Sequence, residues 1–185
     1  MLKDIMQDAE ERMEKAVESL QTDLRAIRTG RASPALVERL QVDYYGAPTP
    51  LNQLAGISVP EPRLLVIRPW DKNTLGIIQK AILGSDLGLT PANDGQVIRL
   101  AVPQLTEERR RDLAKVVDKR AEEARVAVRN VRRDAIDMMR ELEKEKMIDE
   151  DQLYEGRDDI QKVTDGYVEQ VDEIGKAKKT EIMEV

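Results

Sequence analysis

The 185-residue chain contains no cysteine, no histidine and no phenylalanine. The absence of cysteine and histidine excludes disulfide bonds, thiol nucleophiles, imidazole acid–base catalysis and ordinary zinc sites. Aromatic residues make up only 3% of the chain, whereas charged residues make up 36%. This composition is typical of long solvated helices that pack through aliphatic stripes, so we expect helix to dominate the fold.

Long apolar runs are also missing. The sequence has no 18-residue apolar span and no signal-peptide core, and residues 1–15 are too acidic for a transit peptide. These absences predict a soluble, cytoplasmic protein with no membrane partner. A chain of this length can bury one large core or two small ones, which limits it to two domains.

Apolar residues near the N-terminus recur at the spacing of one helix face. This spacing predicts a helix from Leu2 to Ile27, which Gly30 is expected to stop. The stripe consists of Met6, Ala9, Met13, Ala16, Leu20, Leu24 and Ile27.

A second apolar stripe follows Thr106, a predicted N-cap with Glu107 and Glu108 in the first turn. Its spacings alternate between four and three, which predicts a coiled-coil-like seam about 39 residues long, or roughly 58 Å at 1.5 Å per residue. The seam consists of Val117, Ala121, Ala124, Val128, Val131, Ala135, Met138 and Leu142.

A third helix is predicted after the break at "MIDEDQ". Gly166 and Gly175 are expected to weaken it by about 1 kcal/mol each. Its apolar face consists of Ile160, Val163, Tyr167, Val171 and Ile174.

Residues 31–105 have a different character, because they hold all eight prolines and several short β-branched runs. The runs "RLQVDYY", "GISVP", "RLLVIRP" and "QVIRLAV" predict strands, and "NTLGIIQKAILGS" predicts one short helix. The first helix finds matching stripes only after residue 106, so the middle segment is predicted to be an insertion. The fold class is therefore α+β, a three-helix bundle of residues 1–30 and 106–185 with an inserted small β/α domain of residues 31–105.

Aromatic residues of the inserted segment are interpreted as structural. Tyr44 and Tyr45 are adjacent, so one is expected in the core and one exposed, and the glycine and prolines after them indicate a turn. Trp70 is expected to pack. Base stacking by the tyrosines is the alternative.

Two chain crossings, "TGRASP" and "VPQLT", connect the predicted domains. Gly30 permits a left-handed conformation, and Pro34 and Pro103 stiffen the chain beyond each crossing. A double crossing of this kind can bend, or it can be a rigid interdomain turn, and the sequence leaves both possibilities open.

Four arginines occupy the run from Arg125 to Arg133, which contains no acid although the whole chain has a net charge of −6. On a helical wheel they form a stripe along one flank of the seam, and the acids fall on the other flank. Arg129 has arginines at both i−4 and i+4, where like charges repel. Because the arginine fork suits phosphate, the stripe predicts contact with the backbone of RNA or DNA. The stripe consists of Arg125, Arg129, Arg132 and Arg133.

Other interpretations of these charges remain open. Residues 147–185 hold twelve acids and five bases, so the third helix could neutralise the stripe from within the bundle. A second basic cluster, near the crossings, could contact RNA or a partner, or could pair with Glu107, Glu108 and Asp112. That cluster consists of Arg25, Arg28, Arg31, Arg109, Arg110 and Arg111.

Five motifs, in this order and at these spacings, resemble the bacterial ribosome recycling factor family over nearly the whole chain. They are "IRTGRASPAL", "VDYYGAPTPLNQLA", "AILGSDLGLTP", "VPQLTEERRRDL" and "ARVAVRNVRRDA". The resemblance implies an L-shaped, two-domain molecule of roughly transfer-RNA dimensions. It also implies a translation factor that, with elongation factor G and GTP, disassembles the post-termination 70S ribosome into subunits and releases it from messenger RNA.

The same resemblance implies particular residues and partners. It places Arg129, Arg132 and Arg133 on large-subunit ribosomal RNA, and Arg125 extends the set along the stripe. It implies no enzymatic activity, no cofactor, no metal and no DNA partner, and a closed set of three stripes predicts a monomer. The implied hinge consists of Gly30, Arg31, Ser33, Pro34, Pro103, Gln104, Leu105 and Thr106.

Two rival functions remain open at this point. A coiled-coil-like scaffold or chaperone would bind another helix through its seam, and it predicts self-association or an exposed apolar stripe. An enzyme could use paired carboxylates such as Asp158 and Asp159, but the sequence shows no glycine-rich phosphate loop or dinucleotide fingerprint.

Overall fold

The structure is a computed structural model that describes residues 1–184. The chain forms two compact units, one of which joins the chain up to Arg28 with the chain from Glu107 onwards, while the other spans Thr29–Thr106. The first unit is helical and the second contains a small antiparallel sheet, which confirms the α+β class. Whether residues 1–30 with 106–185 and residues 31–105 fold as independent domains stays a prediction.

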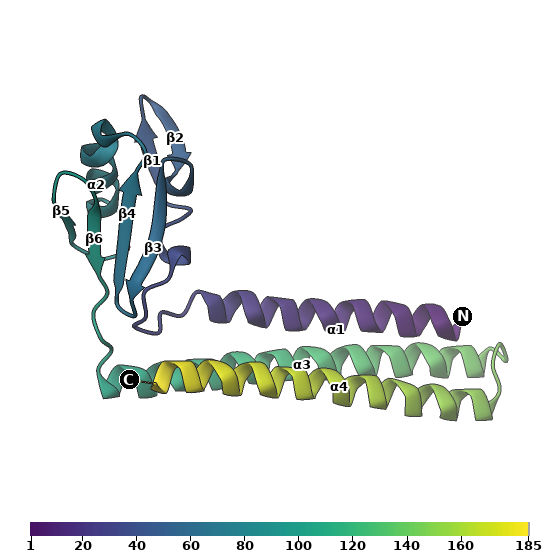
Figure 1. The fold of residues 1–185 in the computed structure, drawn as a ribbon. Helices are drawn as coiled ribbons and strands as arrows, with labels where there is room; N and C mark the ends of the chain where they lie inside the picture. The colour runs from purple at the N-terminus through teal and green to yellow at the C-terminus, as the bar shows by residue number, and fades with distance from the viewer. Residues whose placement is uncertain (185) are drawn as a thin grey trace. The chain divides into compact units, whose positions relative to one another are not determined.

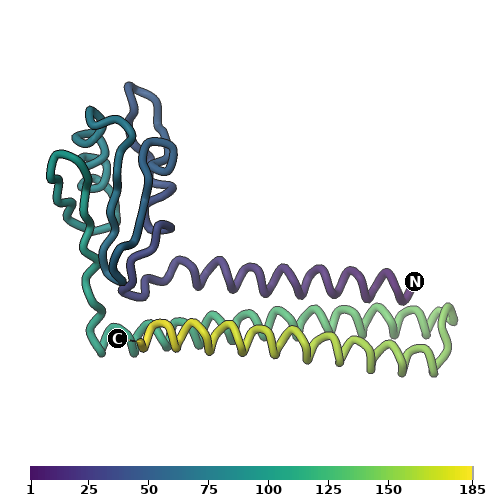
Figure 2. Tube along the Cα trace, viewed as in Figure 1, coloured from purple at the N-terminus to yellow at the C-terminus, as the bar shows by residue number. Residues whose placement is uncertain are grey.

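Three long helices form the first unit: α1 (Leu2–Arg25), α3 (Glu107–Lys144) and α4 (Glu150–Met183). Each packs against the other two, and they run along one another (Figures 1 and 2). Asp149 and Gln152 start α4 as a capping box, because each side chain accepts a hydrogen bond from the backbone N–H of the other, at 2.8 and 3.0 Å. None of the helices within residues 1–184 is both long and apolar enough to cross a membrane.

The predicted stripes meet in one core, with two changes. Ala9 and Met13 of α1 pack with Val128 and Val131 of α3 and with Ile160 of α4. In α1, Val17 is buried and Ala16 only half-buried.

The second change concerns α3. Met139 is fully buried while Met138 is 46% exposed, so the assignment of Met138 to the seam is wrong. Because an α-helix has 3.6 residues per turn, the strict alternation of four and three drifts off the core face, and a second step of four from Ala135 corrects it.

Two glycines of α4 allow it to lie close to α3. A Cβ atom at Gly156 would come within 2.9 Å of Met139 Sδ, and one at Gly175 would lie 3.5 Å from Ala121 Cβ. Gly166, in contrast, faces open space. The buried glycines therefore fit the helix interface, and the expectation that Gly175 only weakens the helix is incomplete.

The second unit contains a four-stranded antiparallel sheet in the order β3-β4-β6-β5 and a separate hairpin of β1 and β2 (Figure 1). Helix α2 packs against β1 and β5, and apolar side chains of these elements form one core. The strands are β1 (Gln41–Tyr44), β2 (Ala47–Pro50), β3 (Ala55–Glu61), β4 (Leu64–Pro69), β5 (Pro91–Asn93) and β6 (Ile98–Ala101), and the helices are α2 (Leu75–Leu83) and the short 3₁₀ turns η1 (Pro34–Leu36), η2 (Leu51–Gln53) and η3 (Lys72–Thr74).

Two aromatic assignments differ from expectation. Trp70 is 71% exposed, so its predicted packing role is wrong. It follows the alternation of β4, in which Ile67 and Pro69 point inward and Arg68 points outward. Tyr45 is 79% exposed as expected for one of the pair, whereas Tyr44 is only half-buried.

Both chain crossings are fixed to the turn between β3 and β4. The backbone N–H of Ala32 donates to the carbonyl oxygen of Pro62 at 2.8 Å, and that of Val102 donates to the carbonyl oxygen of Arg63 at 2.9 Å. Gly30 lies beside the returning crossing with φ at +79°, and α1 ends before it, at Arg25, so Gly30 does not stop the helix as expected. A Cβ atom at Gly30 would lie 3.2 Å from Leu105 Cγ.

Replacing Gly30 with alanine is expected to lower the free energy of unfolding of the sheet unit by about 1–3 kcal/mol, because a left-handed conformation is strained and Leu105 must shift. The matched control is Gly46→Ala, because Gly46 has φ at +86° but no neighbouring atom within 4 Å of the added Cβ. Urea unfolding followed by the fluorescence of Trp70, the chain's one tryptophan, measures both variants. Equal losses at the two sites would contradict the close contact of the crossings.

Candidate RNA-binding surface

The two flanks of α3 face different helices. On one flank Asp134 accepts a hydrogen bond from Arg12 of α1 at 2.8 Å. On the other flank Arg125 and Arg132 reach residues of α4. The arginine stripe follows the groove between α3 and α4. The predicted separation of charge by side is only partly correct. Asp134 lies on the α1 side, but two acids of α3, Glu122 and Asp137, lie on the arginine side.

Arg125 is neutralised inside the bundle. Its Nη1 lies 3.2 Å from Asp172 Oδ1 of α4, and its Nε lies 3.4 Å from Glu122 Oε2 of the preceding turn. Only 21% of its side chain is exposed. Arg125 therefore has internal counter-ions. The alternative interpretation, in which the acidic third helix neutralises the stripe, is correct at this position.

Arg129 shares the same acid but keeps more of its surface. Its Nη1 lies 3.6 Å from Glu122 Oε1, and 44% of the side chain is exposed. An exposed pair at this separation is worth little, at most about 1 kcal/mol. Glu122 lies just outside the acid-free run, which is why that run alone does not reveal the pairing.

Arg132 is held by a neutral residue. Its Nη1 donates to Gln161 Oε1 of α4 at 3.0 Å, and Gln161 Nε2 donates in turn to Asp165 Oδ1 at 2.8 Å. The Nε of Arg132 is buried and has no hydrogen-bond acceptor. Arg132 therefore keeps an uncompensated charge and an unused donor.

Arg133 is exposed and makes no ion pair or hydrogen bond with any residue that the structure describes. Together with Arg132 it borders a hollow of about 480 Å³ between α3 and α4. The lining residues are Arg132, Arg133, Ile136, Asp137 and Arg140 of α3 and Arg157 and Gln161 of α4.

Five of the seven lining residues are absent from the predicted site, among them Arg140, Arg157 and Gln161. Arg140 lies 3.6 Å from Asp137 and continues the stripe by two turns beyond Arg133. Arg157 and Gln161 belong to α4, and their position depends on how the helices align. The sequence did contain one signal for Arg157, because it is the single arginine in the acidic segment 147–185.

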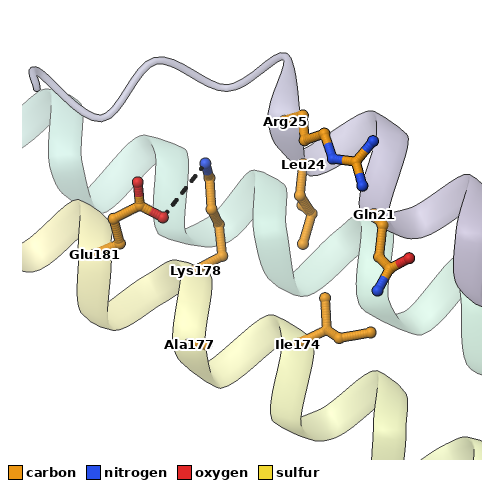
Figure 3. Close-up of a pocket in the computed structure, with 7 residues that line it drawn as sticks. All are labelled: Gln21, Leu24, Arg25, Ile174, Ala177, Lys178 and Glu181. Atoms are coloured by element: carbon orange, nitrogen blue, oxygen red, sulfur yellow. Dashed lines mark ion pairs between the residues drawn. The ribbon is translucent and has the colours of Figure 1, made fainter. Parts of the chain in front are cut away.

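A second hollow, of about 330 Å³, lies between α1 and α4. Leu24 and Ile174 point into it, and Lys178 pairs with Glu181 at 3.6 Å (Figure 3). Arg25 is its one remaining cation among the described lining residues. This hollow therefore lacks the concentrated positive charge of the first.

The other basic residues near the crossings are mostly engaged. Arg111 pairs with Glu107, and Arg110 is buried with an Nε that has no acceptor. Arg28, Arg31 and Arg109 also have partners in the chain. The alternative interpretation of this cluster, in which its arginines pair with neighbouring acids, is thus observed at Arg111.

The predicted hinge residues fall into two groups. Ser33 and Pro34 start the 3₁₀ turn η1, where Ser33 Oγ accepts a hydrogen bond from Ala35 N at 3.3 Å. The others lie outside regular secondary structure, between the end of α1 and Ala32 or between Val102 and the start of α3. They are Gly30, Arg31, Pro103, Gln104, Leu105 and Thr106.

The paired carboxylates of the rival enzyme interpretation lie on the surface of α4. Asp158 forms an ion pair with Lys162 at 3.0 Å, and this hydrogen bond and charge raise the pKa of Lys162. Within the described residues, no group of three or more acidic, histidine or cysteine side chains is arranged to hold a metal ion.

Known proteins of one family match this chain over its whole length. The ribosome recycling factor family matches residues 20–183. Ribosome-recycling factors of Syntrophomonas wolfei and Carboxydothermus hydrogenoformans are 60% and 57% identical, with 100% of both chains covered.

Solved structures give the same result. A solution structure of the ribosome recycling factor superposes with a TM-score of 0.79 at 46% identity, covering 100% of this chain and 98% of that one. A second structure is a model of the T. thermophilus factor that, with E. coli elongation factor G, is bound to the E. coli post-termination complex; it matches with a TM-score of 0.65 at 45% identity, with 100% of both chains covered. With its fold and its full-length relatives in agreement, this chain belongs to the ribosome recycling factor family.

Proposed function

We propose that this protein binds the post-termination 70S ribosome and, with elongation factor G and GTP hydrolysis by that factor, promotes disassembly into subunits. The ribosome is thereby released from messenger RNA for a new round of initiation. The observation that carries the proposal is the groove in which Arg132 and Arg133 keep their charge beside α4. Membership of the family supports it, as does a relative at 45% identity that is bound with elongation factor G to such a complex.

Attachment to the ribosome takes place through large-subunit ribosomal RNA. Arg132 and Arg133 contact backbone phosphates, and Arg129 contributes once its weak contact with Glu122 is exchanged for RNA. Arg125 contributes least, because Asp172 already compensates its charge at 3.2 Å. The guanidinium fork suits phosphate oxygens, and each neutralised phosphate adds to the salt dependence of binding.

Movement takes place in the two short links. The hydrogen bonds of Ala32 and Val102 fix the ends of both links to the β3–β4 turn, so bending falls on the segments between Arg25 and Ala32 and between Val102 and Glu107. Elongation factor G pushes the sheet unit, and the long bundle transmits the force as a lever. No covalent bond is made or broken by this chain, which needs no cofactor and acts as a monomer.

The scaffold alternative is disfavoured by the packing of the bundle. Its seam residues, such as Val128 and Val131 of α3, are buried against α1 and α4 of the same chain. They are therefore not available to a helix of another protein.

A ribosome-splitting assay tests the proposal. Light scattering of post-termination ribosomes is expected to fall when the protein, elongation factor G and GTP are all present. Omission of any one component, or replacement of GTP by a non-hydrolysable analogue, is expected to prevent the decrease. Splitting that proceeds equally well without the protein would refute the proposed function.

Replacing Arg132 with alanine is expected to weaken ribosome binding about tenfold, because one phosphate contact is lost. The slope of log K against log salt should become shallower by about 0.7–0.9, and the fold should remain intact. Arg125→Ala is the matched control on the same helix and should change the slope much less. Equal effects at the two positions, measured by sedimentation binding at several salt concentrations, would contradict the distinction between them.

A further inference from the structure

We propose that α4 forms the second wall of the RNA-binding site, with Arg157 as a phosphate ligand and Gln161 as the residue that positions Arg132. This inference rests on the proposed function and narrows the site from a stripe on one helix to a pocket between two. The pocket is the 480 Å³ hollow beside Arg132, and its ligand is one phosphate group of the RNA backbone.

Charge is concentrated around this pocket. Four arginines and one carboxylate line it, and that carboxylate, Asp137, compensates Arg140 at 3.6 Å. The other three arginines have no carboxylate partner among the described residues, although the chain as a whole has a net charge of −6. Like charges gathered around one hollow repel each other unless an anion enters it. The arrangement therefore favours an anionic ligand.

Gln161 holds Arg132 without cancelling its charge. Two arginines of α3 reach α4, and their partners differ: Arg125 contacts a carboxylate at 3.2 Å, whereas Arg132 contacts the neutral amide oxygen of Gln161 at 3.0 Å. Asp165 accepts a hydrogen bond from the amide nitrogen of Gln161, which turns the amide oxygen toward Arg132. The guanidinium is thus oriented in advance and still attracts phosphate.

An unused donor of Arg132 points to the same ligand. The buried Nε has no acceptor, which is uncommon and unfavourable in a folded protein. The Nε and Nη2 groups form the edge of the fork that Gln161 does not occupy. A bidentate contact of this edge with a phosphate oxygen in the adjoining pocket requires the guanidinium to turn so that the Nε leaves its buried position.

Replacing Arg157 with glutamine tests the second wall. Affinity for vacant 70S ribosomes is expected to fall about tenfold, and the salt slope to become shallower by about 0.7–0.9. Lys162→Gln is the matched control, because it removes one positive charge from the same helix, outside the pocket lining. Its salt slope should stay close to that of the unaltered chain.

Replacing Gln161 with glutamate tests the positioning role. The new carboxylate keeps the length of the side chain and an acceptor for Arg132 but neutralises the guanidinium. We expect a loss of about tenfold in ribosome affinity and a shallower salt slope. Gln170→Glu adds the same charge nine residues further along α4, on the opposite face, and should have little effect. The Tm of each variant is the folding control and should be unchanged. If Gln161 had only a structural role, its replacement would leave the salt slope unaltered.

The outcomes separate this inference from the proposed function. If Arg157→Gln and Gln161→Glu bind ribosomes like the unaltered chain while Arg132→Ala binds weakly, the two-helix pocket is refuted and attachment through α3 stands. If Arg132→Ala also binds normally, both are refuted.

A free phosphate ion is the other possible source of this ligand chemistry. A titration with inorganic phosphate at constant ionic strength, followed by the Nε–Hε resonance of Arg132, detects it. Saturable binding of the ion, combined with ribosome affinity that does not depend on Arg157, would overturn the assignment to RNA.

Discussion

The close approach of α3 and α4 determines which partners Arg125 and Arg132 meet on α4. Gly156 lies against Met139, and Gly175 against Ala121, so the helices meet through glycine at two positions separated by nineteen residues. Because the interface is this close, side chains of α4 reach those of α3 without a water layer between them. Asp172 contacts Arg125, and Gln161 contacts Arg132, at hydrogen-bond distance. A Cβ atom at Gly156 would meet Met139 Sδ at 2.9 Å, so the Met139 side chain would have to shift.

Two arginines of one stripe meet chemically different partners at this interface. At Arg125 the partner is charged, so the pair stabilises the bundle and leaves little field outside it. At Arg132 the partner is neutral, so packing and hydrogen bonding fix the side chain while its charge remains uncompensated. A buried, uncompensated donor such as the Nε of Arg132 is a cost to the free protein. In the two-helix pocket proposed above, a phosphate group would satisfy this donor.

The sequence predicted the bundle well because helical periodicity is a local property. It predicted the flank of α3 that carries the arginines for the same reason. It could not predict that Arg125 meets Asp172 whereas Arg132 meets Gln161, because that depends on the alignment of α3 with α4 and hence on Gly156, Gly175 and the capping box at Asp149. The contributions of Arg157 and Gln161 were missed for this reason.

The sheet unit shows where local signals mislead. Strand β2 contains Pro48 and Pro50, which lack the N–H that a ladder needs, so its sequence is typical of a turn. It nevertheless pairs with β1 because it has only one neighbour. Trp70 is exposed because the alternation of β4 continues to it, which places its side chain on the outward face with Arg68.

Rigidity and bending depend on different parts of the chain. The bundle is stiff because three apolar stripes bury one another along helices of 24, 38 and 34 residues. The links lie outside the helices, and they are constrained among other contacts by the close approach of Gly30 to Leu105 and Pro103 and by the two hydrogen bonds to the β3–β4 turn. Since those hydrogen bonds clamp both links at one turn, any bending is confined to a few residues on each side. In the proposed function, a force on the sheet unit would reach the bundle through these two short links.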